Sequence, residues 1–130
     1  MHLYHHFVKY ASILIAEDDP LLRDLYKRKF SMCGYGIRVV ENGAEAIAAI
    51  EESVPDVAIL DINMPVMDGF SVLEKYPEKQ RPFSVIMLTN FGDEKNKKRG
   101  ESLGVSKFFI KKDMTIKTLI EMVESHLEKS

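Results

Sequence analysis

The chain has 130 residues, of which 45% are hydrophobic and 29% charged, and its formal net charge is −2. This length and composition are typical of one globular domain, and the slightly negative charge gives no electrostatic reason to expect nucleic acid or an anionic membrane surface as a partner. The single cysteine, Cys33, excludes an internal disulfide, and no apolar run is long enough to span a bilayer, so we expect a cytoplasmic location.

Residues 1–11 are expected to form an N-terminal arm of unassigned role, ahead of one domain over residues 12–130. The arm contains three of the four histidines, but their spacing does not define a metal site. It also lacks the long apolar core of a signal peptide. We therefore assign no function to this segment.

The first predicted strand and helix adjoin a run of acids. Residues 12–16 predict a short buried strand, which stops at Glu17, Asp18 and Asp19. Pro20 at the first helical position, with Asp19 before it as N-cap, predicts a helix that runs to about residue 32 and ends at Gly34. Helical spacing predicts one apolar side made of Leu21, Leu22, Leu25, Tyr26 and Phe30.

The second and third strands are predicted over residues 36–40 and 57–61. Between them we expect a turn at residues 42–43 and an alanine-rich helix over residues 44–53, whose inward side chains are Ile47, Ile50 and Val54. The third strand is an uninterrupted apolar run that ends at Asp61. Such a run is typical of a strand buried on both faces of a parallel sheet.

The second half of the chain continues the alternation, with a helix over residues 70–76, a strand over 84–88, a helix over 92–103, a strand over 107–110 and a helix over 115–129. The helix over 92–103 is unusual because Leu103 is almost its only apolar residue. It also contains Gly100, which costs about 1 kcal/mol relative to alanine in a helix interior. We expect this helix to be weakly anchored and easy to move.

Five short apolar strands that alternate with five helices predict an α/β fold of the (βα)5 type, a three-layer sandwich with a parallel sheet between two layers of helices. In such a sheet the carboxyl ends of all strands lie along one edge, where open α/β sheets place their functional sites. The residues at these strand ends are Glu17, Asp18, Asp61, Thr89 and Lys111.

These strand-end side chains have the chemistry of a phosphoryl-transfer site. Three close carboxylates repel one another, and a hard cation such as Mg²⁺, which prefers oxygen ligands, would resolve the repulsion. An ammonium and a hydroxyl are donors suited to phosphoryl oxygens, and one carboxylate can act as the nucleophile. Each residue also has a simpler interpretation, with Asp61 as a turn-forming acid, Asp19 as an N-cap, Thr89 as a strand-end cap and Lys111 as a solvated lysine.

Several motifs resemble the receiver domain of bacterial two-component response regulators. They are Glu17-Asp18, the run Asp61-Ile62-Asn63-Met64-Pro65 with Asp68-Gly69, Leu88-Thr89, and Phe108 three residues before Lys111. The resemblance implies a flavodoxin-like, CheY-like fold with a five-stranded parallel sheet in the order 2-1-3-4-5. It makes residues 12–130 the receiver domain.

The resemblance also implies how the site works. Asp61 would accept a phosphoryl group from a sensor histidine kinase or a phosphotransfer protein, so the domain would be a signalling phosphoacceptor and not an enzyme. Mg²⁺ would be the cofactor. Its ligands would be Asp18, Asp61, the backbone carbonyl of Asn63 and, through water, Glu17.

The remaining implied roles concern the switch. Lys111 would pair with Asp61 and then with the phosphoryl group, while Thr89 would donate a hydrogen bond to a phosphoryl oxygen. Phe108 would turn inward as Thr89 moves. The resulting population shift would change the surface of the fourth helix, fifth strand and fifth helix, to which a partner or output domain would bind.

Two positions depart from the pattern of the family. Lys112 follows Lys111, where the family has a proline after a cis bond. Because a cis bond to a non-proline residue costs roughly 3 kcal/mol, we expect this bond to be trans. Asn90 and Phe91 follow Thr89, where the family has a small residue, and we expect them to slow the access of water and give a long-lived phosphoryl-aspartate.

Three other classes of protein are alternatives to a phosphorylated receiver domain. A haloacid-dehalogenase-like phosphatase needs a second aspartate where Asn63 stands, and an amide cannot act as a general acid. A flavodoxin needs a phosphate-binding loop after the first strand, where Glu17 and Asp18 would repel a phosphate. The third is a receiver-like interaction module that is not phosphorylated, which would be expected to lack an acid or the lysine.

Overall fold

A computed structural model describes residues 11–90, 94–105, 107–113 and 115–128 of the chain. Within this part, strands and helices alternate as β1 Ser12–Ala16, α1 Pro20–Met32, β2 Gly36–Val40, α2 Gly43–Glu52, β3 Val57–Asp61, α3 Gly69–Lys75, β4 Ser84–Thr89, α4 Glu94–Ser102, β5 Lys107–Ile110 and α5 Ile116–Glu128. Short 3₁₀ turns follow α3 and β5 at η2 Glu78–Gln80 and η3 Lys111–Asp113. Of the N-terminal arm only residue 11 is described, so the expectation for that segment stays untested. No described helix is long and apolar enough to cross a membrane.

All five strands are parallel and form one sheet in the order β2-β1-β3-β4-β5. This confirms the predicted flavodoxin-like fold. The central strand β3 is buried along its whole length, as the uninterrupted apolar run predicted. Its last residue, Asp61, pairs in register with Leu88 of β4.

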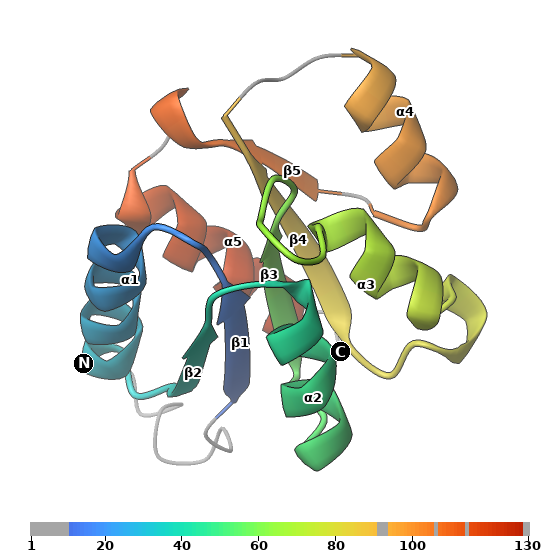
Figure 1. Cartoon of the computed structure of the whole chain (residues 1–130). Coiled ribbons are helices and arrows are strands. Elements are labelled where there is room, and N and C mark those ends of the chain that lie inside the picture. The colour runs from blue at the N-terminus through green and yellow to red at the C-terminus, as the bar shows by residue number, and fades with distance from the viewer. Residues whose placement is uncertain (1–10, 91–93, 106, 114, 129–130) are drawn as a thin grey trace.

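Helices cover both faces of the sheet, with α1 and α5 on one face and α2, α3 and α4 on the other (Figure 1). Because successive strand residues point to opposite faces, each strand contributes to two separate cores. The core under α1 and α5 contains Ile13, Ile15, Tyr26, Phe30, Val57, Ile59, Ile86, Leu88, Phe109, Leu119 and Val123. The other core contains Leu14, Ala16, Ala46, Ile50, Ala58, Leu60, Phe70, Leu73, Val85 and Met87.

The helix boundaries follow the capping signals in the sequence. Asp19 caps α1, since its Oδ1 accepts hydrogen bonds from the backbone of Leu21 at 2.9 Å and of Leu22 at 3.4 Å. Gly34 has a φ of +90° just beyond the end of α1, a conformation that glycine adopts at little cost. Asn42, predicted to lie in a turn, instead caps α2 by accepting a hydrogen bond from the backbone of Glu45 at 2.9 Å.

Two predictions about buried side chains were wrong. Leu21 is 80% exposed, because at 100° per residue it lies about 140° around α1 from the buried Tyr26. Val54 is 50% exposed, because α2 ends at Glu52 and the extended Ser53 takes the next residues out of the helical phase.

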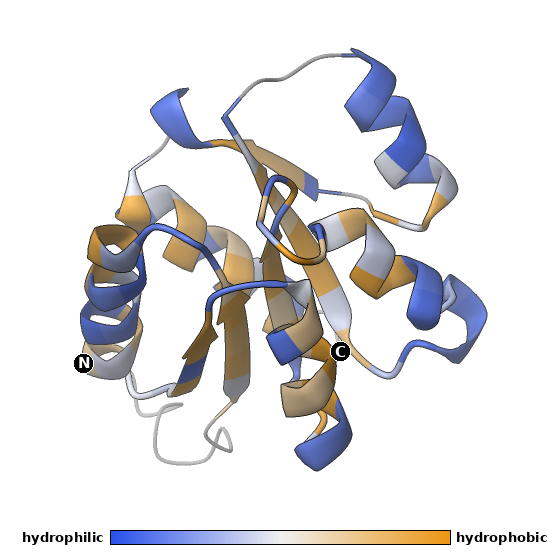
Figure 2. Cartoon of the chain, in the orientation of Figure 1, coloured by the Kyte–Doolittle hydropathy of each residue, from blue (hydrophilic) through white to orange (hydrophobic). Residues whose placement is uncertain are grey.

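Helix α4 is polar along most of its length and lies at the outer end of its layer (Figures 1 and 2). All residues of Glu94–Ser102 are described, and among them only Gly100 is buried. Arg99 connects α4 to α3, with its guanidinium 4.6 Å from the ring centre of Phe70 and 3.6 Å from a carboxylate oxygen of Glu74. Both contacts are partly exposed to solvent, and the easy movement of α4 stays a prediction.

Candidate functional site

The alternation of side chains along the strands determines which strand-end groups meet. Asp61 is two residues beyond Ile59 and therefore projects to the side of α1 and α5. Glu17, two residues beyond Ile15 of the neighbouring strand, projects the same way, and so does Lys111, two residues beyond Phe109. Three charged groups that lie far apart in the sequence thus share one corner of the sheet edge.

Asp61 and Lys111 form the centre of this corner. Lys111 Nζ donates a hydrogen bond to Asp61 Oδ2 at 2.5 Å and lies 2.6 Å from Glu17 Oε1. Both carboxylates are buried, and the lysine side chain is only 14% exposed. The interpretation of Lys111 as a solvated lysine is therefore wrong.

Two further residues complete the acidic site. Ligand oxygens of Glu17, Asp18 and Asp61 lie within 4.8 Å of one another, with Asp18 exposed to solvent. The backbone N–H of Asn63 donates to Asp61 Oδ1 at 3.2 Å, which fixes the second oxygen of that carboxylate. The role expected for the Asn63 carbonyl stays a prediction.

The proximity of these charges shifts their protonation equilibria. Burial raises the pKa of Glu17 to about 7, with the Lys111 ammonium opposing the shift and the Asp61 carboxylate adding to it. Burial alone would lower the pKa of Lys111, but its contacts with Asp61 and Glu17 outweigh burial and raise it. The ammonium is therefore retained between two acids, one of which holds a proton near neutral pH.

The donor set fits a hard divalent cation. Glu17 Oε1 is buried and accepts no hydrogen bond within the described part of the chain, although Lys111 Nζ lies 2.6 Å away in an ion pair. An exposed carboxylate, Asp18, lies beside this under-satisfied oxygen and can accept a solvent-borne ion. All the available donors are oxygens, the ligand type that Mg²⁺ prefers.

The predicted switch residues lie on the other face of the sheet. Thr89 ends β4 and is buried, two residues beyond Met87 of the core under α2 and α3. Phe108 packs against the same core. Its ring abuts Gly100 of α4, since a Cβ built on Gly100 would overlap Phe108 Cζ and lie 2.8 Å from Cε1. The aromatic side chain therefore links β5 directly to α4.

The departures from the family pattern have separate outcomes. The peptide bond between Lys111 and Lys112 is trans, as predicted, and both residues lie in the 3₁₀ turn η3. Asn90 is exposed directly after β4. Phe91 lies outside the described residues, so its proposed effect on water access stays a prediction.

The loop from β3 to α3 packs closely against Asp61. Gly69 at the start of α3 is needed there, because a Cβ would overlap the backbone oxygen of Asp61. Met67 N donates to Pro65 O at 2.7 Å across Val66, whose φ is +67°. This is a γ-turn with a β-branched residue in the left-handed region, a strained conformation of the kind found at functional sites.

Arg23, to which the sequence pattern gave no role, shapes the acidic loop. Arg23 Nη1 donates to the backbone oxygens of Glu17 and Asp18, both at 2.9 Å, and its Nη2 pairs with Glu41 at 3.1 Å. These bonds fix the backbone that carries two of the three acids. No signal in the sequence pointed to Arg23, because its partners are backbone atoms brought near by the turn.

Comparison with known proteins agrees with this geometry. A model of the response regulator receiver domain matches residues 13–124. The probable transcriptional regulator ycf27 of Guillardia theta is 34% identical over 99 residues, 76% of this chain and 39% of that protein. The sensor protein EvgS of Escherichia coli (strain K12) is 34% identical over 95 residues, 73% of this chain and 8% of that protein. The chain thus spans less than half the length of either relative.

Solved structures give the same result. A CheY-like response regulator receiver domain protein from Methanospirillum hungatei JF-1 is 28% identical with a TM-score of 0.85, covering 93% of this chain and 96% of that one. A DNA-binding response regulator of the LuxR family from Staphylococcus aureus is 31% identical with a TM-score of 0.83, covering 90% and 98%. Since the family model matches residues 13–124 and the chain has the fold and the strand-end motifs described above, the chain belongs to the response regulator receiver domain family.

Proposed function

We propose that this receiver domain accepts a phosphoryl group on Asp61 from a sensor histidine kinase or a phosphotransfer protein. An oxygen of Asp61 attacks the phosphorus of a phosphohistidine, forming the P–O bond as the P–N bond breaks and the imidazole leaves. The reaction makes the domain a signalling phosphoacceptor and not a turnover enzyme.

One observation carries this proposal. The Asp61 carboxylate is buried on rigid backbone at the end of the central strand, with the Lys111 ammonium 2.5 Å from one of its oxygens. In the proposed transfer, Lys111 moves from that oxygen to a phosphoryl oxygen and offsets its negative charge. Thr89 supplies a hydroxyl from the next strand.

The proposed cofactor is Mg²⁺, held by Asp18, Asp61 and the Asn63 carbonyl, with Glu17 binding through water. When bound, the ion would neutralise charge on the phosphoryl oxygens. Glu17 must lose its proton for the full acidic site to form, because the neutral acid is a poor ligand for a hard cation.

The proposed output is a change in the surface of α4, β5 and α5, where a partner or output domain binds. The contact of Phe108 with Gly100 supports this route, because movement of the ring toward or away from Thr89 alters the support of α4. The chain spans less than half the length of its curated relatives. We therefore include the control of a partner or output domain in this proposal.

The test is the intact mass of the chain after incubation with Mg²⁺ and acetyl phosphate. The parent chain and an Asp24→Ala control should each gain one phosphoryl group, whereas Asp61→Ala should gain none. Asp24 is a suitable control because it is an exposed acid on the surface of α1, where it pairs with Arg28.

A gain that persists in Asp61→Ala would overturn the assignment of the acceptor. If neither acetyl phosphate nor a panel of phosphorylated histidine kinases phosphorylates a parent chain that binds Mg²⁺, the chain is the unphosphorylated interaction module considered above.

A further inference from the structure

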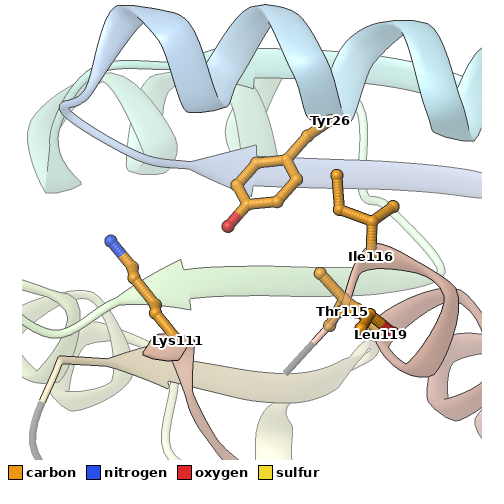
Figure 3. Close-up of a pocket in the computed structure, with 5 residues that line it drawn as sticks. All are labelled: Tyr26, Lys111, Thr115, Ile116 and Leu119. Atoms are coloured by element: carbon orange, nitrogen blue, oxygen red, sulfur yellow. The ribbon is translucent and has the colours of Figure 1, made fainter. Parts of the chain in front are cut away.

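The structure has a small pocket on the α1 and α5 side of the charged corner, lined by Tyr26, Lys111, Thr115, Ile116 and Leu119 (Figure 3). Its volume is about 30 Å³, which is enough for one water molecule. Lys111 therefore contacts two environments, the acidic site on one side and this pocket on the other.

The hydrogen-bonding capacity of Lys111 is not exhausted by the acids. An ammonium has three N–H donors. One donates to Asp61 Oδ2 at 2.5 Å, and the ammonium also forms an ion pair with Glu17 Oε1 at 2.6 Å. An N–H donor therefore remains for the pocket, where a donor without an acceptor would cost free energy.

Among the residues that line the pocket, Tyr26 is the one suited to accept this bond. Ile116 and Leu119 are apolar. The Thr115 hydroxyl already accepts from the backbone of Thr118 at 3.2 Å and bonds its hydroxyl at 3.0 Å. The Tyr26 hydroxyl and the Lys111 ammonium point into the same space from α1 and from the end of β5 (Figure 3).

The setting of Tyr26 keeps its hydroxyl in one place and one charge state. Its ring is buried in the core under α1 and α5, among residues such as Phe30 and Leu119. Burial, aided by the nearby Glu17 carboxylate, raises the pKa of Tyr26 to about 12, so the hydroxyl stays neutral in the working range of the protein. The helical spacing of the sequence predicted that Tyr26 lies on the apolar side of its helix, and it indicated no polar role for the hydroxyl.

We propose that Tyr26 is a positioning residue, whose hydroxyl holds one water molecule in the pocket; this water accepts a further hydrogen bond from Lys111 and keeps the ammonium against Asp61. The water accepts from Lys111 Nζ and donates to Tyr26 Oη. This inference rests on the proposed phosphorylation of Asp61 and adds to it a group that acts through Lys111 from outside the acidic site.

The experiment compares Tyr26→Phe with the parent chain, using Mg²⁺ and acetyl phosphate. The substitution keeps the buried ring and removes only the hydroxyl. We expect the maximal phosphorylation rate to fall about three- to tenfold, the effect of one hydrogen bond, with little change in the acetyl phosphate concentration that gives half the maximal rate. In a Lys111→Ala background, the same substitution should have no further effect.

Tyr35→Phe is the matched control. Tyr35 is a second tyrosine with a partly buried side chain, and its ring centre lies 6.0 Å from that of Phe30. Burial raises its pKa to about 12 as well. It does not line the pocket, so its hydroxyl should be dispensable for phosphorylation.

A second readout does not depend on phosphorylation. In ¹H–¹⁵N spectra, the Lys111 ammonium protons should exchange with solvent faster in Tyr26→Phe than in the parent and in Tyr35→Phe. The role of Tyr26 would be overturned if Tyr26→Phe left the ammonium exchange rate unchanged. It would also be overturned if Tyr26→Phe lowered the phosphorylation rate by the same factor in the Lys111→Ala background as in the parent. A parent chain that takes no phosphoryl group from acetyl phosphate or from the panel of histidine kinases would instead refute the proposed function, and ammonium exchange would still decide the inference.

Discussion

Substituting Gly100 by alanine should reverse the usual effect of this change in a helix. Gly100 lies in the last turn of α4, and within a helix alanine is favoured over glycine by about 1 kcal/mol. In this chain a Cβ at Gly100 would overlap Phe108 Cζ and lie 2.8 and 3.1 Å from the ring atoms Cε1 and Cε2. Real Cβ atoms essentially never come closer than 3.0 Å to a neighbour, so the ring or the helix must move.

The magnitude follows from these two opposing terms. Overpacking a well-packed contact costs roughly 1–3 kcal/mol, and the gain in helix propensity returns about 1 kcal/mol. We therefore expect Gly100→Ala to lower the free energy of unfolding by about 1 kcal/mol. In a Phe108→Ala background the overlap is absent, and the same substitution should raise it by about 1 kcal/mol.

The assay is urea denaturation of the four chains in this double-mutant cycle, at equal pH and without Mg²⁺. The expected coupling energy between Gly100 and Phe108 is about 2 kcal/mol. Lys97→Ala is the control, because Lys97 is an exposed residue of the same helix and its replacement should change stability by less than about 0.5 kcal/mol.

Gly100→Ala that is as stable as the parent, or more stable, would refute this reasoning. So would a destabilisation of the same size with and without the Phe108 ring. Either result would mean that Phe108 does not rest against α4, and the proposed route from Thr89 to the output surface would lose its support.

Three further predictions concern the site and its loops. The folded pKa of Glu17, about 7, lies above its usual 4.5, so its stabilising contribution is present below pH 4.5 and is lost as the pH rises through 7. In urea denaturation without metal, the free energy of unfolding of the parent should fall by up to about 3 kcal/mol relative to Glu17→Gln between pH 4.5 and 8. A parent that gains stability relative to the variant over this range would contradict the raised pKa of Glu17. Val66→Gly should raise the free energy of unfolding by about 1 kcal/mol, because Val66 is 84% exposed and the change relieves a positive φ at little loss of contact; a less stable variant would show that the γ-turn is not strained. Asn90→Ala should shorten the lifetime of the phosphoryl-aspartate, measured by the loss of phosphorylated mass after acetyl phosphate is removed, and an unchanged lifetime would exclude Asn90 as a barrier to water.

The sequence determined the fold because its patterns are local. Alternating apolar strands and amphipathic helices require a parallel sheet covered on both faces, and Asp19, Pro20 and Gly34 mark helix ends by their own backbone chemistry. The strand-end acids and Lys111 followed from the same logic, since all parallel strands end at one edge. The trans bond before Lys112 also follows from local chemistry, because the residue is not proline.

The tertiary structure decided the features that depend on contacts between distant segments. Gly100 appears in the sequence as a weak point of α4, and only the position of Phe108 shows that a side chain there would not fit. Arg23 and Tyr26 appear as ordinary helix residues until α1 lies over the charged corner. Leu21 satisfied an apolar pattern yet is exposed, because a pattern gives the period of a helix but not the extent of the surface that it covers. Val54 is half-exposed because α2 ends before it.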